Sequence, residues 1–220
     1  MPKLFIVLFF SSFNLFAQIN SGTIKYKVSV GEDELYKSMP KEMQEEYKKD
    51  IESESYTLIF SEKKSVFKLD QGIENSTKKE YYKDIDSTFS LRYKFDSDFG
   101  KLIIKENRNI DWKIDYNESK KINEFTCFKA SSSYTLDRGE KKFTFPLIAW
   151  FCPEIPVPLG PLGYGNLPGL ILELQDRITL YGVTNINFGK IESEIIKPKK
   201  GKVITQEEYN SMISKQFEKN

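Results

Sequence analysis

The sequence predicts an α+β fold: a curved antiparallel β-sheet of eight to ten strands, one or two peripheral helices, and a proline- and glycine-rich segment at the rim. Short runs of β-branched and aromatic residues recur at nearly even spacing, separated by clusters of Asp, Asn, Ser and Gly. Only two stretches have the spacing of apolar residues that is typical of helices. The 220 residues contain no repeat or linker, and this length suits one domain.

Residues 1–17 have the pattern of a secretory signal peptide. Lys3 gives the short positive start, residues 4–10 form the apolar stretch, and Ala17 is a small residue suited to cleavage. The apolar run is shorter than the roughly 20 residues that cross a bilayer. We therefore expect an exported protein with a single mostly-β domain over residues 18–220 and no membrane span in the mature chain.

The first strand is expected over residues 21–30, where apolar and polar residues alternate. A polar helix follows, with Pro40 at its first position and its end near Asp50. A second helix is expected from Thr205, because Thr205 and Glu208 have the spacing of a capping box. Further strands are expected at 56–60, 65–69, 81–82, 89–93, 101–105, 111–116 and 170–174.

A long β-hairpin is expected between residues 125 and 152, because two strand-like runs flank a turn signal at 137–140. If the pairing is centred between Gly139 and Glu140, the numbers of opposed residues sum to 279. The only two cysteines, Cys127 and Cys152, then lie opposite each other, and we expect a structural disulfide between them in an oxidising compartment. One face of the hairpin is then largely apolar, with Phe128, Ala130, Ser132, Tyr134, Phe145, Leu147, Ala149 and Phe151.

Residues 153–169, which we call the proline-glycine segment, contain five prolines and four glycines. Proline fixes φ and lacks a backbone donor, while glycine permits left-handed backbone and close approach of other atoms. The segment cannot continue a sheet ladder. We expect a rigid connection with turns that wraps the rim of the sheet and leads into the strand at 170–174.

Residues 149–174 closely resemble the signature of the GLPGLI family of exported Bacteroidetes proteins, which is named for this peptide. Asn166 stands where that family usually has its first glycine, and Asn tolerates positive φ best among the other residues. The resemblance implies a periplasmic or cell-surface protein associated with the outer membrane, whose partner is an outer-membrane receptor or another envelope protein. It brings no catalytic residue. The matching residues are Trp150, Pro153, Glu154, Pro156, Gly160, Pro161, Leu167, Pro168, Gly169, Leu170 and Ile171.

The composition excludes several chemistries. The chain has no histidine, so Ser-His-Asp and Cys-His catalysis, His-ligated zinc and a histidine pH switch are not available. With 33 Lys and Arg against 32 Asp and Glu, the surplus of positive charge that nucleic-acid binding requires is missing. Ser-x-x-Lys pairs occur at about the frequency expected by chance. We therefore expect no catalytic residue, cofactor, metal site or nucleic-acid partner.

Four residues at the proline-glycine segment are candidates to line a ligand site. Trp150 and Glu154 precede or begin the segment, Tyr164 lies within it, and Glu173 follows it. Packing and capping explain the same residues at least as well. The Asp96-Ser97-Asp98 run starts like a calcium loop but lacks the distal glutamate, and turn chemistry explains it better.

The sequence favours a non-enzymatic envelope binding or accessory protein. Its sheet concavity or proline-glycine rim would receive a peptide, a lipid-like ligand or an outer-membrane partner. A periplasmic hydrolase that uses carboxylates or metal-bound water is the alternative, and it requires two or more of Asp84, Asp86, Glu154 and Glu173 in one pocket. A purely structural surface protein would instead have no concave apolar pocket.

Overall fold

The computed structural model describes residues 19–71, 80–108, 110–138, 141–191 and 194–217, so the expected signal peptide lies outside the described residues. Within these ranges, twelve strands form one sheet in the order β12-β6-β5-β4-β3-β2-β1-β11-β10-β9-β8-β7. Of the strand pairs in these described residues, only β12 and β6 are parallel. The strands are β1 (Ser21–Val30), β2 (Ser55–Ser61), β3 (Lys64–Gln71), β4 (Glu80–Asp84), β5 (Phe89–Asp96), β6 (Gly100–Asn107), β7 (Lys113–Ile122), β8 (Phe125–Arg138), β9 (Lys141–Cys152), β10 (Leu170–Asp176), β11 (Thr179–Phe188) and β12 (Lys202–Thr205).

The helices are few and peripheral. They are α1 (Glu34–Ser38), α2 (Lys41–Glu52) and α3 (Gln206–Phe217), with a short 3-10 turn η1 (Pro161–Gly163) inside the proline-glycine segment. The predicted helix at Pro40 is confirmed as α2, which begins one residue later, whereas α1 was not predicted. The capping box of α3 is confirmed, because Thr205 N donates to Glu208 Oε2 at 2.7 Å and Glu208 N donates to Thr205 Oγ1 at 3.1 Å.

The predicted pairing of the long hairpin is confirmed. Phe128 lies opposite Phe151 and Ala130 opposite Ala149, and every further pair keeps the sum of 279. Ala130, Ala149 and Phe151 are fully buried, so the predicted apolar face is the core face. None of the helices in the described part of the chain is long and apolar enough to cross a membrane.

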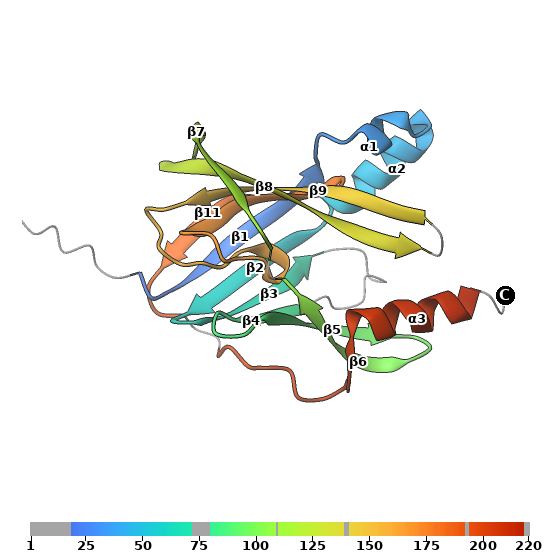
Figure 1. Cartoon of the computed structure of the whole chain (residues 1–220). Coiled ribbons are helices and arrows are strands. Elements are labelled where there is room, and N and C mark those ends of the chain that lie inside the picture. The colour runs from blue at the N-terminus through green and yellow to red at the C-terminus, as the bar shows by residue number, and fades with distance from the viewer. Residues whose placement is uncertain (1–18, 72–79, 109, 139–140, 192–193, 218–220) are drawn as a thin grey trace, which may run out of the picture.

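The sheet curls until its two halves face each other across the core. In Figure 1, β7, β8 and β9 lie above β3 to β6, and the proline-glycine segment runs between the two layers. Two additional strands enlarge the sheet beyond the predicted eight to ten. β11 lies near the centre of the sheet, between β1 and β10, and β12 forms one edge.

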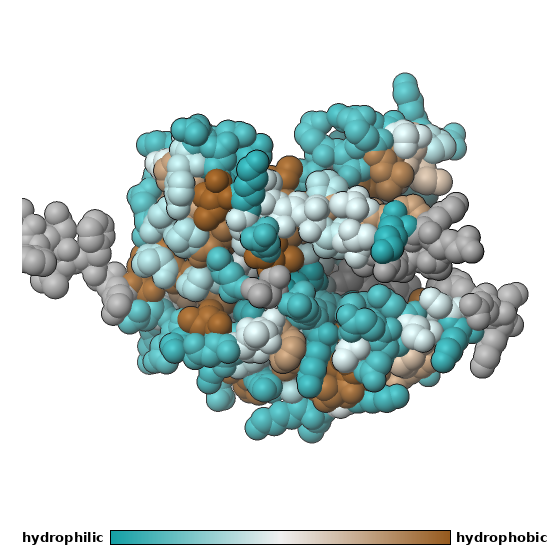
Figure 2. Space-filling model, in the orientation of Figure 1, coloured by the Kyte–Doolittle hydropathy of each residue, from teal (hydrophilic) through white to brown (hydrophobic). Residues whose placement is uncertain are grey.

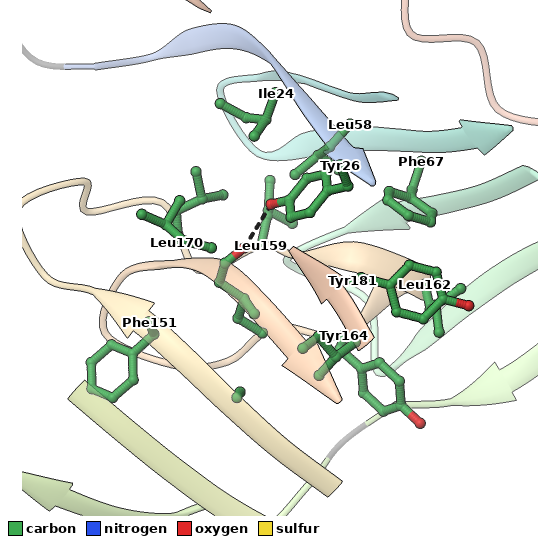
Figure 3. Close-up of a cluster of buried hydrophobic side chains, with 14 of the residues drawn as sticks. Ile24, Tyr26, Leu58, Phe67, Phe151, Leu159, Leu162, Tyr164, Leu170 and Tyr181 are labelled. Atoms are coloured by element: carbon green, nitrogen blue, oxygen red, sulfur yellow. Dashed lines mark hydrogen bonds between the residues drawn. The ribbon is translucent and has the colours of Figure 1, made fainter. Parts of the chain in front are cut away.

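The proline-glycine segment fills the concave side of the sheet, which corrects its predicted place along the rim. Figure 3 shows Leu159, Leu162 and Tyr164 among side chains of the surrounding strands. The sheet holds the segment and the start of β10 by side-chain hydrogen bonds. Tyr26 Oη donates to Ile171 O at 2.6 Å, and Ser90 Oγ donates to Gly163 O at 2.7 Å. The buried residues of the segment include Ile155, Val157, Leu159, Leu162, Tyr164 and Leu167.

Two positions show why the segment needs its turn residues. A Cβ atom on Gly169, whose φ is 158°, would lie 2.1 Å from Cys152 O, so no side chain fits there. Asn166 has φ of 63°, which confirms that Asn occupies a left-handed turn position in place of glycine.

Candidate functional site

A groove of about 460 Å³ lies where α1 meets β9 and the turn between β10 and β11. We call it the α1 groove. Leu35 on α1 is half exposed, and Ile178 on the other side of the groove is buried. Figure 2 shows hydrophobic atoms gathered at the helices in the upper right of the view. The lining combines the apolar Leu35, Phe145, Pro146 and Ile178 with Glu32, Asp33, Glu34, Lys37, Thr144 and Arg177.

Arg177 places a cation in this groove. It lies in the tight turn between β10 and β11 with a positive φ of 57°, and its guanidinium carbon is 4.2 Å from the centre of the Phe145 ring. Among the described residues, no carboxylate lies within ion-pair distance of Arg177. Lys37, the other cation of the groove, lies 3.0 Å from both Glu32 and Glu34. Arg177 is therefore the cation of this groove that is available to an anionic group.

A chain of polar contacts leads from the groove into the interior. The rings of Phe145 and Tyr134 are 5.7 Å apart, and Tyr134 Oη donates to Asp176 Oδ1 at 2.7 Å. Tyr164 Oη donates to Asp176 Oδ2 at 3.2 Å and accepts a hydrogen bond from Arg108 Nη1. Tyr164, which was predicted to line a ligand site, thus belongs to an interior network next to the groove.

The far end of this network is an ion-pair cluster below Tyr164. Glu106 forms ion pairs with two guanidinium groups. Its Oε1 lies 2.5 Å from Arg92 Nε, and its Oε2 lies 2.5 Å from Arg108 Nη2. Glu106 is buried, and both arginine side chains are less than a fifth exposed. A buried carboxylate with two cationic partners is compensated in charge and fixed in position. The network therefore ties the end of β6 to the proline-glycine segment.

Burial sets the protonation of the tyrosines in and near this network. It raises the pKa of Tyr164 and Tyr134 well above the usual phenol value, and Arg108 lowers the pKa of Tyr164 by less than burial raises it. Burial likewise raises the pKa of Tyr81 to about 12. These phenols therefore stay protonated at neutral pH, and Tyr134 and Tyr164 act as hydrogen-bond donors to Asp176.

Trp150 and Glu173, two other predicted ligand-lining residues, lie side by side on the outer face of the sheet. They are register partners across β9 and β10. Lys120 joins them, because its Nζ lies 2.6 Å from Glu173 Oε1 and 4.4 Å from the centre of the Trp150 ring. This cluster does not share a partner with the interior network of Tyr164.

The fourth predicted residue, Glu154, is exposed at the start of the proline-glycine segment. Its Oε1 accepts a hydrogen bond from Thr126 N at 2.9 Å, which is a capping contact between β8 and the turn after β9. The structure therefore separates the four predicted ligand-lining residues into three locations.

The acids required by a carboxylate hydrolase also have separate neighbours. Asp84 Oδ1 accepts from Asp86 N at 3.1 Å, which is turn chemistry, and Asp86 forms an exposed ion pair with Lys63 at 3.0 Å. Glu154 and Glu173 have the partners given above. Among the described residues, no group of three or more Cys, Asp or Glu lies close enough together to hold a metal ion.

Cys127 and Cys152 directly follow the last pair of the β8–β9 ladder, Phe128 and Phe151, and their thiols contact each other. Both are fully buried and are present as free thiols, so the structure does not contain the predicted bond. The hydrogen bond from Cys127 lowers the pKa of Cys152, with help from the backbone N–H groups of Ile155 and Glu154. The thiols are adjacent, and their oxidation stays a prediction.

A second groove, of about 670 Å³, is mainly polar. It lies beside the end of α2, with Lys25 and Lys27 of β1 and Asp70 and Gln71 of β3 among its lining residues. Lys25 already pairs with Asp70 at 3.6 Å, and Asp70 contacts Thr57. The charged groups of this groove therefore partly satisfy each other, unlike Arg177 in the α1 groove.

Comparison with known proteins gives a family model over part of the chain and solved structures of similar fold. A model described as a protein of unknown function (Porph_ging) matches residues 136–173, which span the end of β8, β9, the proline-glycine segment and the start of β10. No curated protein matches the chain.

Two solved structures of PNGF-II, in space groups C2 and P21, are similar to the chain. Their TM-scores are 0.57 and 0.56 at 16% and 13% identity, and each comparison covers 89% of this chain. The chain spans about a third of the length of PNGF-II, at 33% and 34%. At this identity the likeness is one of fold.

Sequence reasoning did not identify Arg177, Arg108, Glu106 or Asp176. Each is an ordinary charged residue in or next to a strand, with no motif around it. The α1 groove forms only when the turn at Arg177 meets α1, more than 140 residues away in the sequence. The turn between β10 and β11 has Arg177 at positive φ, so the sequence lacks the glycine or asparagine that usually indicates such a turn.

Proposed function

We propose that this chain is an exported cell-envelope protein of the GLPGLI type that binds, without catalysing a reaction, a small amphipathic anion in its α1 groove. The ligand class is a peptide or lipid-like molecule with an apolar body and one carboxylate or phosphate. The observation that carries the proposal is the guanidinium of Arg177, which lies over the Phe145 ring in a groove of mixed apolar and charged lining and has no carboxylate within ion-pair distance among the described residues.

The composition of the groove supports this ligand class. Binding sites for small molecules are mostly apolar, with a few polar groups that fix orientation. Leu35, Phe145 and Ile178 give the apolar contact, and Arg177 can bind an anionic group with two parallel hydrogen bonds. Such charge-assisted bonds contribute about 1.5–3 kcal/mol each.

The filled concavity also supports binding at the surface. The proline-glycine segment occupies the space between the two halves of the sheet; Ser90 holds it by a hydrogen bond, and Tyr26 bonds the start of β10, which follows it. A ligand inside the sheet would have to displace this segment and its buried apolar side chains. The α1 groove requires no such displacement.

Isothermal titration calorimetry with dodecanoate and the neutral dodecanol tests the proposal. The native protein should bind dodecanoate about tenfold or more tightly than dodecanol, because only the carboxylate can pair with Arg177. R177Q should remove this preference, and R177K should keep part of it. K121Q, which removes an exposed charge on β7, should leave both affinities unchanged.

The apolar contribution is tested separately with L35S. This variant should weaken dodecanoate and dodecanol by the same factor, because Leu35 contacts only the apolar body. Equal binding of both probes by the native protein, or no binding of either, would exclude the proposed site. If the proposal is correct, native mass spectrometry of the protein purified from its own envelope should show a bound amphipathic anion or an envelope partner.

A further inference from the structure

A second surface of the molecule lies on the far side of the lower half of the sheet. Leu102 and Ile104 of β6 and Ile204 of β12 point toward α3, where they pack with Tyr209 and Met212. The alternate residues of the same strands therefore point to the opposite face of the sheet. The strands β5, β6 and β12 form this outer face.

Large apolar side chains project from this face. Phe89 and Phe95 of β5 are 44% and 50% exposed, and Val203 of β12 is 54% exposed. The register places them on one side: Phe95 lies opposite Lys101, Tyr93 opposite Ile103, and Val203 beside Ile103. Soluble proteins commonly expose single apolar residues, but here two phenylalanines at the two ends of β5 and a valine on β12, two strands away, share one face of the sheet, which indicates a contact surface.

Unpaired lysines surround these apolar residues. Lys101 is the register partner of Phe95, and Lys105 Nζ lies 5.8 Å from the centre of the Phe89 ring, so both lysines share the face with the phenylalanines. Among the described residues, neither lysine has a carboxylate within ion-pair distance. Lys199 and Lys200 are exposed where the chain enters β12, whereas Lys202, the register partner of Leu102, lies on the α3 side of the sheet.

The positive charge is local. The chain as a whole has a net charge of +1, and β4, next to β5, has Glu80 and Asp84 on the same side of the sheet. Lys64 and Lys68 of β3 lie on this side too, but each is opposite one of these carboxylates. Lys101 and Lys105, which lie opposite Phe95 and Leu91, are at the end formed by β5, β6 and β12. We call Phe89, Phe95, Lys101, Lys105 and Val203 the basic-aromatic face.

We propose that the basic-aromatic face docks on a bilayer surface that carries anionic headgroups. Lysines near such a surface are attracted to its negative potential, while the exposed phenylalanines and the valine enter the boundary between headgroups and acyl chains. A purely polyanionic partner would use the lysines but leave the apolar side chains exposed to water. Docking here leaves the α1 groove free, because its residues belong to α1, β9 and the turn between β10 and β11.

Vesicle flotation with the full chain tests this proposal. Vesicles of phosphatidylcholine alone are compared with vesicles that contain one quarter phosphatidylglycerol, at low and at high salt. The native protein should float with the anionic vesicles and less with the neutral ones, and high salt should weaken the association. K101Q/K105Q should lower the partition coefficient about 25-fold, since each lysine contributes roughly a fivefold factor.

The apolar part of the face is tested with F89A/F95A. Both rings are about half exposed, so the fold should be kept, and partition into anionic vesicles should fall about tenfold or more because less apolar area is buried. K48Q/K49Q, on the exposed side of α2, is the charge-matched control, and M43A, with Met43 53% exposed, is the apolar control. Both controls should float like the native protein.

Three results would overturn the proposal. Equal association with neutral and anionic vesicles would remove the role of the lysines, and full binding by F89A/F95A would reduce the contact to non-specific charge attraction. Sedimentation that shows a dimer which F89A/F95A dissociates would assign this face to a second copy of the chain. Thermal unfolding of each variant shows whether it is folded, and a folded, monomeric K101Q/K105Q that fails to float supports the proposal.

Discussion

Tyr164 donates a hydrogen bond to Asp176 across 3.2 Å, and this contact joins the proline-glycine segment to the end of β10. The same phenol oxygen accepts from Arg108, whose guanidinium pairs with Glu106 on β6. One side chain of the segment therefore connects both halves of the curled sheet. The segment is a structural part of the core, and its side chains take the place of a ligand in the concavity.

We expect Y164F to destabilise the fold by about 1–3 kcal/mol, because the partly buried Arg108 and Asp176 each lose a hydrogen-bond partner while the ring stays in place. Urea unfolding at neutral pH measures the change. Y116F is the matched control, since Tyr116 is 59% exposed, and it should change stability by less than about 0.5 kcal/mol. Equal stability of Y164F and native protein would show that the network contributes no net energy.

The adjacent thiols of Cys127 and Cys152 should form a disulfide when the folded protein is exposed to an oxidising thiol buffer. Two thiols then lose two hydrogens to the oxidised buffer, and the intact mass falls by about 2 Da. The bond would close the loop of chain between Cys127 and Cys152. By the chain-entropy model, closing a loop of this length should stabilise the oxidised protein by about 3 kcal/mol relative to the reduced one.

Alkylation without reductant, followed by mass spectrometry, separates the two states. The oxidised protein should resist alkylation even after unfolding. C127S/C152S should unfold at the same urea concentration with and without reductant, and it serves as the control. If the native protein purified from its envelope alkylates fully at both cysteines on unfolding, the bond is absent in the exported form.

Gly169 should tolerate no side chain. G169A should destabilise the protein by roughly 2–4 kcal/mol, because its Cβ would lie 2.1 Å from Cys152 O at a φ of 158°. G182A is the control, since no atom lies within 4 Å of the corresponding Cβ position in β11. A thermal melt in which both variants match the native protein would mean that the segment can move away from β9.

Much of the local structure could be predicted from the sequence, because it depends on short-range patterns. The turn signal at 137–140 and the apolar face gave the correct hairpin register. The spacing of Thr205 and Glu208 gave the start of α3, and the tolerance of Asn for positive φ gave the turn at Asn166. The overall mostly-β character with few helices follows from the same alternation of side chains.

The misses depend on tertiary contacts. The proline-glycine segment was expected at the rim because prolines cannot join a ladder, yet the segment satisfies its backbone by bonds to Ser90 and to neighbouring turns and so can be buried. β11 was missed because Arg177, at positive φ, carries no turn signal. Alternation along β9 and β10 sends two of the candidate residues, Trp150 and Glu173, to the outer face of the sheet, away from Tyr164.

Asp96 gives a prediction for the dependence of stability on pH. Its side chain is only 9% exposed; one oxygen lies 3.1 Å from Lys94 Nζ, and the other accepts from the backbone N–H groups of Asp98 and Phe99. Burial raises the pKa of this carboxyl. The hydrogen bonds from Lys94 and from the two backbone N–H groups lower the pKa by more than burial raises it, so the pKa in the folded state is below its usual value. The ionised form therefore stabilises the fold.

The sign follows from the lower pKa of the folded state. The unfolded chain binds a proton at Asp96 near pH 4, before the folded protein does, so the stabilisation is complete above about pH 4 and is lost as the pH falls through the folded pKa. We expect D96N to cost about 1–3 kcal/mol in urea unfolding at pH 7, since Asn keeps the size of the side chain but loses the charge-assisted bonds. At pH 3 the difference between D96N and native protein should be clearly smaller. The control D111N, at an exposed position, should have nearly the stability of the native protein at both pH values. If the loss of stability in D96N is the same at pH 3 and pH 7, Asp96 acts through packing rather than charge.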